Sequence, residues 1–299
     1  MSKNKQLKGS ILIMSCSLFW GFTPILAKLT YSMGNNAINM AFLRNFLALP
    51  ILFLILIFRK ISFKLDIKEL FTLLILGTFN AFTTIFLYMS YSYVSVGVAT
   101  TLNCSYPIFV MIGSIIFLKQ DTSKKKIFSL IVTMLGIGMF FSITGSQDNP
   151  LAGTLIALLS SMCYAIYVLL FDKTNLKKHN AFKLTFYICI VNSLCCFIFG
   201  LIQNQITLNL PQLVWIYSTI IAILCSVLCI TFFQLGIKYV GSVTTSILGM
   251  TEPIASIVLG ILFLNESMTW QKFIGCLLIV IGILILQINK KKINSLKNC

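Results

Sequence analysis

Ten apolar stretches follow one another along the chain, separated by short polar segments. Each stretch holds roughly 17–25 residues, about the length at which an α-helix crosses the ~30 Å hydrocarbon core of a bilayer. The first begins near Ile11 and extends to about Tyr31, which is too long for the apolar part of a signal peptide. The pattern therefore predicts an all-α integral membrane protein with ten transmembrane helices.

The basic residues alternate between the gaps. Of the 23 lysines and arginines, 20 lie in every second gap, counting the two tails. Cationic loops are retained on the cytoplasmic side of a membrane, so this alternation predicts that both ends of the chain are cytoplasmic. We expect a multi-pass protein of the cytoplasmic (inner) cell membrane. The 20 residues are Lys3, Lys5, Lys8, Arg59, Lys60, Lys64, Lys68, Lys119, Lys124, Lys125, Lys126, Lys173, Lys177, Lys178, Lys183, Lys238, Lys290, Lys291, Lys292 and Lys297.

The composition excludes a soluble protein, because 58% of the residues are hydrophobic and only 10% are charged. The net charge of +16 is spread over loops and tails, so no nucleic-acid partner is expected. We expect the lipid bilayer, with its anionic headgroups, to be the partner of these basic residues. None of the ten cysteines forms a CxxC pair, and the single histidine, His179, lies in a predicted loop. We therefore expect neither a metal site nor another cofactor.

The chain contains an internal repeat. A shift of 146 residues aligns 93–137 with 239–283 without a gap, and a shift of 144 aligns the first and sixth spans more weakly. The two units are 1–146 and 147–299, each with five spans, and together they form one membrane domain. Because five is odd, the second unit enters the membrane from the opposite side. Inverted repeats are an architecture of alternating-access transporters, in which the substrate binds near the midplane between the halves.

The chain also resembles the ten-helix drug/metabolite transporters of the EamA type over nearly its whole length. The resemblance implies a membrane exporter or permease, with spans five and ten standing apart from the substrate cavity. One departure is Lys119-Gln120, where the second unit has Asn265-Glu266, so a carboxylate is missing at the end of span four. The matching positions are Phe19-Trp20-Gly21, Arg44, Pro107, Glu252-Pro253, Leu264-Asn265-Glu266, Gly136 and Gly282.

Glu252 is the strongest candidate site residue, since it is the only carboxylate far from either membrane end. Charged groups at such depth are costly and usually face a cavity. Pro253 should kink span nine there and free a backbone carbonyl. We expect Glu252 to bind substrate or a coupling proton and to change its protonation or ionic partner during transport. The alternative is a neutral or paired glutamate that holds span nine against a neighbour.

A second polar stripe runs along span three, with Asn80, Thr84 and Tyr88 at helical spacing. In the repeat, Tyr88 corresponds to Gln234 in span eight, and the two are expected near opposite membrane faces, as paired gate positions. Asn103 lies about one turn before Pro107 in span four and is a further candidate ligand. These positions predict a substrate-binding cavity. Ordinary hydrogen bonds between helices are the alternative.

Two aromatic residues near the centres of spans one and six are repeat mates, Trp20 and Tyr164. They are candidates for a stacking surface on which a planar or cationic substrate lies, with core packing as the alternative. Arg44 lies in the outer half of span two. The sequence favours a structural role for it, such as anchoring the helix to backbone carbonyls, over binding an anionic substrate group.

These features favour a secondary active transporter of small organic metabolites such as amino acids, nucleosides or drug-like molecules, working by alternating access as a monomer or homodimer. No nucleotide-binding motif indicates direct coupling to ATP. The alternatives are a channel or an intramembrane enzyme. Neither an aspartate pair nor a histidine lies within a span, so an enzyme is not expected.

Overall fold

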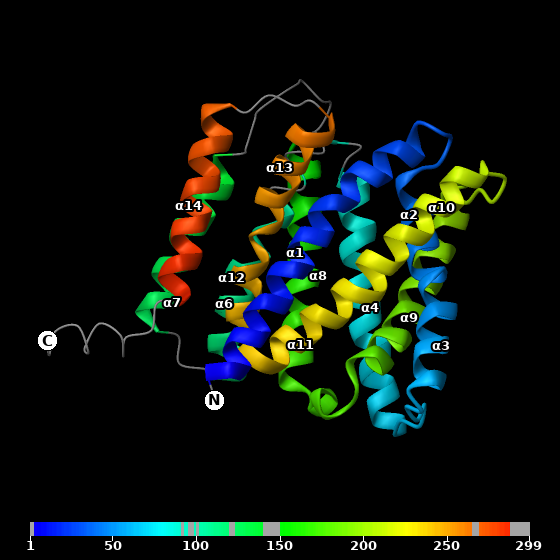
Figure 1. Ribbon diagram of the computed structural model, residues 1–299, viewed down its shortest axis with the longest axis horizontal. Coiled ribbons are helices and arrows are strands. Elements are labelled where there is room, and N and C mark those ends of the chain that lie inside the picture. The colour runs from blue at the N-terminus through cyan, green and yellow to red at the C-terminus, as the bar shows by residue number, and fades with distance from the viewer. Residues whose placement is uncertain are drawn as a thin grey trace, which may run out of the picture.

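The computed structural model of the protein describes residues 3–90, 93–94, 99, 102–119, 123–139, 150–264 and 269–287 (Figure 1). These residues form helices and connecting turns, and none of them lies in a strand. The helices are α1 (Lys3–Tyr31), α2 (Ala37–Phe46), α3 (Ala48–Phe58), α4 (Ile67–Ser90), α6 (Tyr106–Leu118), α7 (Lys124–Gly138), α8 (Pro150–Lys173), α9 (Ala181–Ile202), α10 (Gln212–Ile221), α11 (Ile230–Val240), α12 (Ser242–Gly249), α13 (Glu252–Leu264) and α14 (Trp270–Gln287), with a 3₁₀ turn η1 (Asn175–Lys178) and a π-helix η2 (Ala222–Cys229).

Six segments in the described part of the chain are long and apolar enough to cross a membrane. Large apolar side chains such as Phe58 and Leu262 are exposed on the outside of the bundle, which suits lipid rather than water. The protein is thus all-helical and multi-pass, whereas the full count of ten spans stays a prediction. The six are Asn4–Tyr31, Ala37–Phe58, Ile67–Ser90, Leu151–Lys173, Ala181–Ile202 and Gln212–Val240, and the shorter apolar helices are Tyr106–Leu118 and Phe273–Ile285.

The two sequence units are interleaved rather than side by side. Helix α1 of the first unit packs against α11 and α13 of the second, and α8 of the second packs against α4 and α6 of the first. Glycine permits both contacts. A Cβ on Gly9 would lie 2.9 Å from the Tyr239 Cβ, and one on its repeat mate Gly153 would lie 2.7 Å from the Tyr93 Cβ. Matched glycines therefore make matched contacts across the two units.

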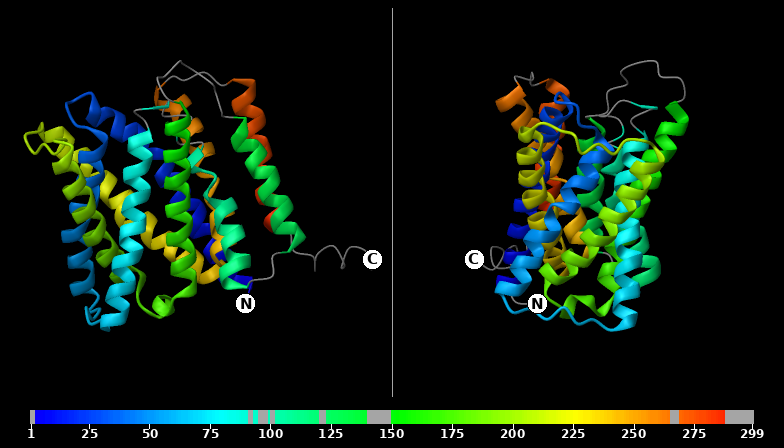
Figure 2. Two further views of the ribbon diagram at one scale, coloured as in Figure 1. Left: turned by 180° about the vertical axis from the view of Figure 1, so that it is seen from behind. Right: turned by 90° about the vertical axis from the view of Figure 1, so that its right-hand side faces the viewer.

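Helices α7 and α14 pair with each other and stand apart from the rest of the bundle (Figures 1 and 2). Their backbones approach closely at Gly136 and Gly282, and the Ser129 Oγ donates a 2.6 Å hydrogen bond to the carbonyl oxygen of Gly282. Small residues allow this approach where lipid provides no hydrophobic drive for association.

Two segments of the second unit depart from a regular α-helix. Span nine is broken, because α12 ends at Gly249 and α13 begins at Glu252, so the expected kink at Pro253 is an interruption of the helix. Proline lacks the N–H that would continue the ladder. Helices α10 and α11 are joined by the π-helix η2. A π-helix widens the turn and often marks a functional site.

Asp172, near the end of α8, binds the start of α12 on the side of the bundle that carries the N-terminus (Figure 1). Its Oδ2 accepts hydrogen bonds from the Ser242 Oγ at 2.6 Å and the Ser242 N–H at 3.2 Å, and its Oδ1 pairs with Lys177. These contacts satisfy a backbone donor at a helix start, as an N-cap does.

We expect Asp172→Ala to lower the free energy of unfolding by about 1–3 kcal/mol, because the Ser242 N–H loses its acceptor. Thermal unfolding of purified protein in detergent measures the change. Asp66→Asn is the control, because it removes an exposed carboxylate immediately before α4 while keeping a side chain that can cap a helix. Equal melting temperatures for the two variants would contradict the capping role.

Candidate substrate-binding site

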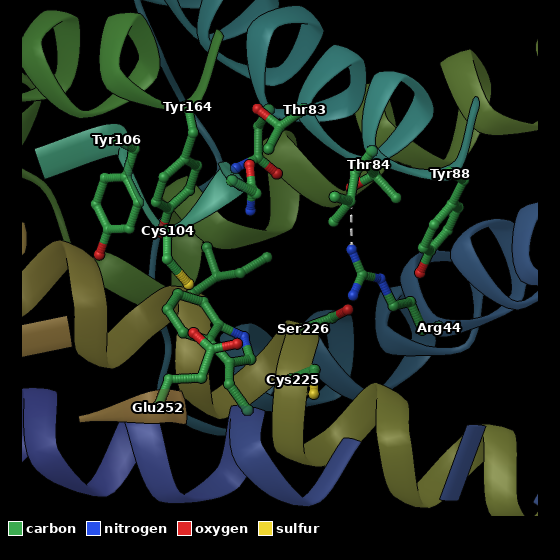
Figure 3. Close-up of a pocket in the computed structure, with 15 residues that line it drawn as sticks. Arg44, Thr83, Thr84, Tyr88, Cys104, Tyr106, Tyr164, Cys225, Ser226 and Glu252 are labelled. Atoms are coloured by element: carbon green, nitrogen blue, oxygen red, sulfur yellow. Dashed lines mark hydrogen bonds between the residues drawn. The ribbon is translucent and has the colours of Figure 1, made fainter. Parts of the chain in front are cut away.

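A cavity of about 200 Å³ lies inside the bundle, between helices of both sequence units (Figure 3). One water molecule needs only about 10–15 Å³, so the cavity has room for a small organic molecule. Its walls come from α1, α2, α4, the start of α6, α8, η2, α11 and the start of α13. The lining residues are Trp20, Arg44, Asn80, Thr83, Thr84, Leu87, Tyr88, Asn103, Cys104, Tyr106, Tyr164, Cys225, Ser226, Ile230 and Glu252.

The structure brings together most of the site residues proposed from the sequence. Seven of the eight line this one cavity, although they lie on five different spans. Their role as substrate ligands stays a prediction. The seven are Trp20, Asn80, Thr84, Tyr88, Asn103, Tyr164 and Glu252.

Gln234 departs from the prediction, because it does not line the cavity. It is buried in α11, only 1% exposed, and none of the described residues forms a hydrogen bond of normal geometry with its amide. The repeat alignment with Tyr88 carries no information about helix type. The π-helix η2 precedes Gln234 and has more residues per turn than an α-helix, so the side chains that follow it face in other directions than in a regular helix. The same π-helix places Ser226 in the wall.

Hydrogen bonds hold the polar wall of the cavity in place. Asn80 Oδ1 accepts a 2.7 Å bond from the Asn192 amide of α9, and Asn103 Oδ1 accepts a 3.0 Å bond from the Ser160 hydroxyl of α8. Each cavity amide is thus fixed by a partner on another helix. This supports the view that interhelical bonding and cavity lining are compatible roles for the same residues.

An aromatic wall adjoins the place where span nine is broken. The rings of Tyr106 and Tyr164 meet edge to face with centroids 4.7 Å apart, and Trp20 and Tyr164 both pack on Phe233, at 5.5 and 5.6 Å. Tyr106 was not among the site residues proposed from the sequence. Its hydroxyl donates a 3.2 Å bond to the Ser246 carbonyl oxygen, so it links the start of α6 to α12.

Glu252 opens α13 at the break in span nine and faces the cavity (Figure 3). A carboxylate is favoured in the first turn of a helix, where the N-terminal dipole is positive. Among the described residues, none donates a hydrogen bond to this carboxylate or forms an ion pair with it. Glu252 is therefore available to a ligand rather than committed to a structural bond.

Arg44 also lines the cavity, which the sequence did not favour. Its Nη2 donates a 3.1 Å hydrogen bond to the Thr84 hydroxyl, while its buried Nε has no hydrogen-bond partner among the residues that the structure describes. No described carboxylate lies within ion-pair distance of it. An arginine within a span is costly, so a buried one with no described ionic partner indicates a functional role.

The model of the EamA-like transporter family matches residues 7–142 and 151–288, one match on each sequence unit. The chain belongs to the EamA-like transporter family. It is therefore a multi-pass membrane transporter, and the resemblance drawn from its motifs is confirmed. As that resemblance implied, none of the described lining residues lies on α7 or α14.

Similar proteins support the same assignment. An uncharacterized transporter of Archaeoglobus fulgidus is 26% identical over 93% of this chain and 98% of its own length. UDP-xylose transporter 2 of Arabidopsis thaliana is 22% identical over 70% of this chain and 61% of its own length. A solved structure titled only as the crystal structure of a protein has a TM-score of 0.80 at 14% identity and covers 93% of this EamA-like transporter and 97% of that chain. This last likeness shows the fold alone.

Proposed function

We propose that the protein is a secondary active transporter that exports small organic metabolites across the cytoplasmic membrane by alternating access. The cavity carries this proposal. It is walled by both sequence units, and two helix starts, those of α6 and α13, meet there. Interrupted helices around a site between repeats are typical of secondary transporters, because freed backbone groups and half-helix ends can bind substrate.

The matched contacts of the two units support alternating access. Gly9 and Gly153 occupy corresponding places in the repeat, and each packs against the corresponding residues of the other unit. If the units are related by a two-fold axis in the membrane plane, exchange of their conformations turns an inward-open shape into an outward-open one. The two states then have similar energies, as transport in a cycle requires.

Protons are the proposed coupling ion, and Glu252 is the group that takes them up. It is the only carboxylate among the described residues that line the cavity, and none of the described residues is bonded to it. A carboxyl group inside a membrane that meets each side in turn can bind a proton on one side and release it on the other.

Transport is tested with purified protein in liposomes. Vesicles are loaded in turn with the twenty amino acids, the ribonucleosides, tetraphenylphosphonium or UDP-xylose, the last because of the Arabidopsis relative. We expect saturable counterflow of a labelled compound from at least one of these classes, and none in vesicles without protein. Flux that rises linearly with concentration would indicate a channel instead and would contradict the proposal.

A further inference from the structure

Two opposite charges face the same cavity without neutralising each other. Arg44 lies on α2 beside Thr84 and Tyr88, whereas Glu252 lies at the start of α13 near Tyr106 and Tyr164 (Figure 3). Their side chains are farther apart than the 4.0 Å of an ion pair, although both line the same cavity. The cavity therefore has a cationic end and an acidic end.

Each end can bind a charged group. At the cationic end, the buried Arg44 Nε has no hydrogen-bond partner in the described part of the chain, and Nη2 is fixed by Thr84, so the guanidinium is oriented before a ligand arrives. A guanidinium donates two parallel hydrogen bonds to a carboxylate or phosphate. At the acidic end, the carboxylate of Glu252 and nearby aromatic rings suit an ammonium group, which interacts with both carboxylates and ring faces.

We propose that the substrate is a zwitterion whose anionic group binds Arg44 and whose ammonium group binds Glu252. A simple cation would leave Arg44 without a partner, and a simple anion would leave Glu252 without one. Buried charges are normally paired, so a ligand that carries both charges is the one that satisfies the whole cavity. This inference rests on the proposed transport function and narrows its substrate class.

The experiment compares matched ligands in the full-length protein reconstituted in liposomes. The twenty free amino acids serve as zwitterions, and each that binds is compared with its methyl ester, which keeps only the ammonium, and its N-acetyl form, which keeps only the carboxylate. Binding is measured by thermal shift and competition. We expect each modification to weaken binding by about 10–100-fold, the loss for a hydrogen-bonded charge.

Two variants test which end of the cavity binds which charged group of the substrate. Arg44→Gln should bring the affinity for the zwitterion down to that for its methyl ester while leaving ester binding unchanged. Glu252→Gln should bring the affinity for the zwitterion down to that for its N-acetyl form while leaving binding of the N-acetyl form unchanged. Arg59→Gln and Asp66→Asn change charges outside the cavity and are the controls. If Arg44→Gln does not fold, Arg44→Lys keeps the charge but loses the two parallel donors, and it should still prefer the zwitterion to the ester, by a smaller factor.

The zwitterion assignment is wrong if esters or N-acetyl forms bind as tightly as the free amino acids, or if no amino acid binds. The transport function is judged separately by counterflow of the nucleosides, tetraphenylphosphonium and UDP-xylose. Saturable counterflow of one of these without amino acid binding would reject the substrate class and keep the transporter.

Discussion

Glu252→Gln is expected to abolish pH-driven flux of whichever compound is carried in the counterflow experiment, while some exchange at equal pH is retained. Glutamine preserves the shape and hydrogen bonding of the side chain but cannot take up and release a proton. Exchange needs only the alternation of the cavity, whereas accumulation against a gradient needs the proton. Flux into reconstituted vesicles with and without a pH gradient measures the two activities.

The control for this experiment is Asp66→Asn, which removes an exposed carboxylate before α4 and lies outside the cavity. It should leave pH-driven flux at the level of the unmodified protein. Gel filtration shows whether each variant is folded. Full pH-driven flux in Glu252→Gln would mean that Glu252 has a structural role and that the coupling group lies elsewhere.

Gly136→Ala is expected to separate α7 from α14 and to lower the free energy of unfolding by about 1–3 kcal/mol, the usual cost of overpacking. A Cβ at this position would lie 2.7 Å from the carbonyl oxygen of Gly275 and 3.0 Å from the Ile279 nitrogen. Both are backbone atoms, so no side chain can turn aside to make room. Thermal unfolding in detergent measures the loss.

Gly138→Ala is the matched control, because it lies two residues further along the same helix and a Cβ there would meet nothing within 4 Å. Alanine is favoured over glycine in a helix by about 1 kcal/mol, so this variant should be as stable as the original protein or more so. The prediction that alanine at position 136 clashes with α14 is wrong if the two alanine variants unfold at the same temperature.

The sequence determined the features that depend on local composition. Membrane insertion follows from the length of each apolar stretch, and the repeat follows from aligned residues such as Tyr93 and Tyr239. Depth along a span is also a local property, so Glu252 and Trp20 could be identified as site candidates before their neighbours were known. A costly polar group far from both membrane ends is a signal that one helix carries by itself.

The tertiary structure decided which side chains share a cavity. A structural role was favoured for Arg44 because depth along a span does not reveal which way a side chain faces, and Gln234 was assigned to the cavity through its repeat alignment with Tyr88. The contacts of α2 with η2 and α4 bring Arg44 to the cavity wall, whereas Gln234, which follows the π-helix, is not among the described lining residues. Whether a polar residue meets a ligand depends on helix rotation and on contacts between distant segments, and the spacing of residues within one helix does not encode these.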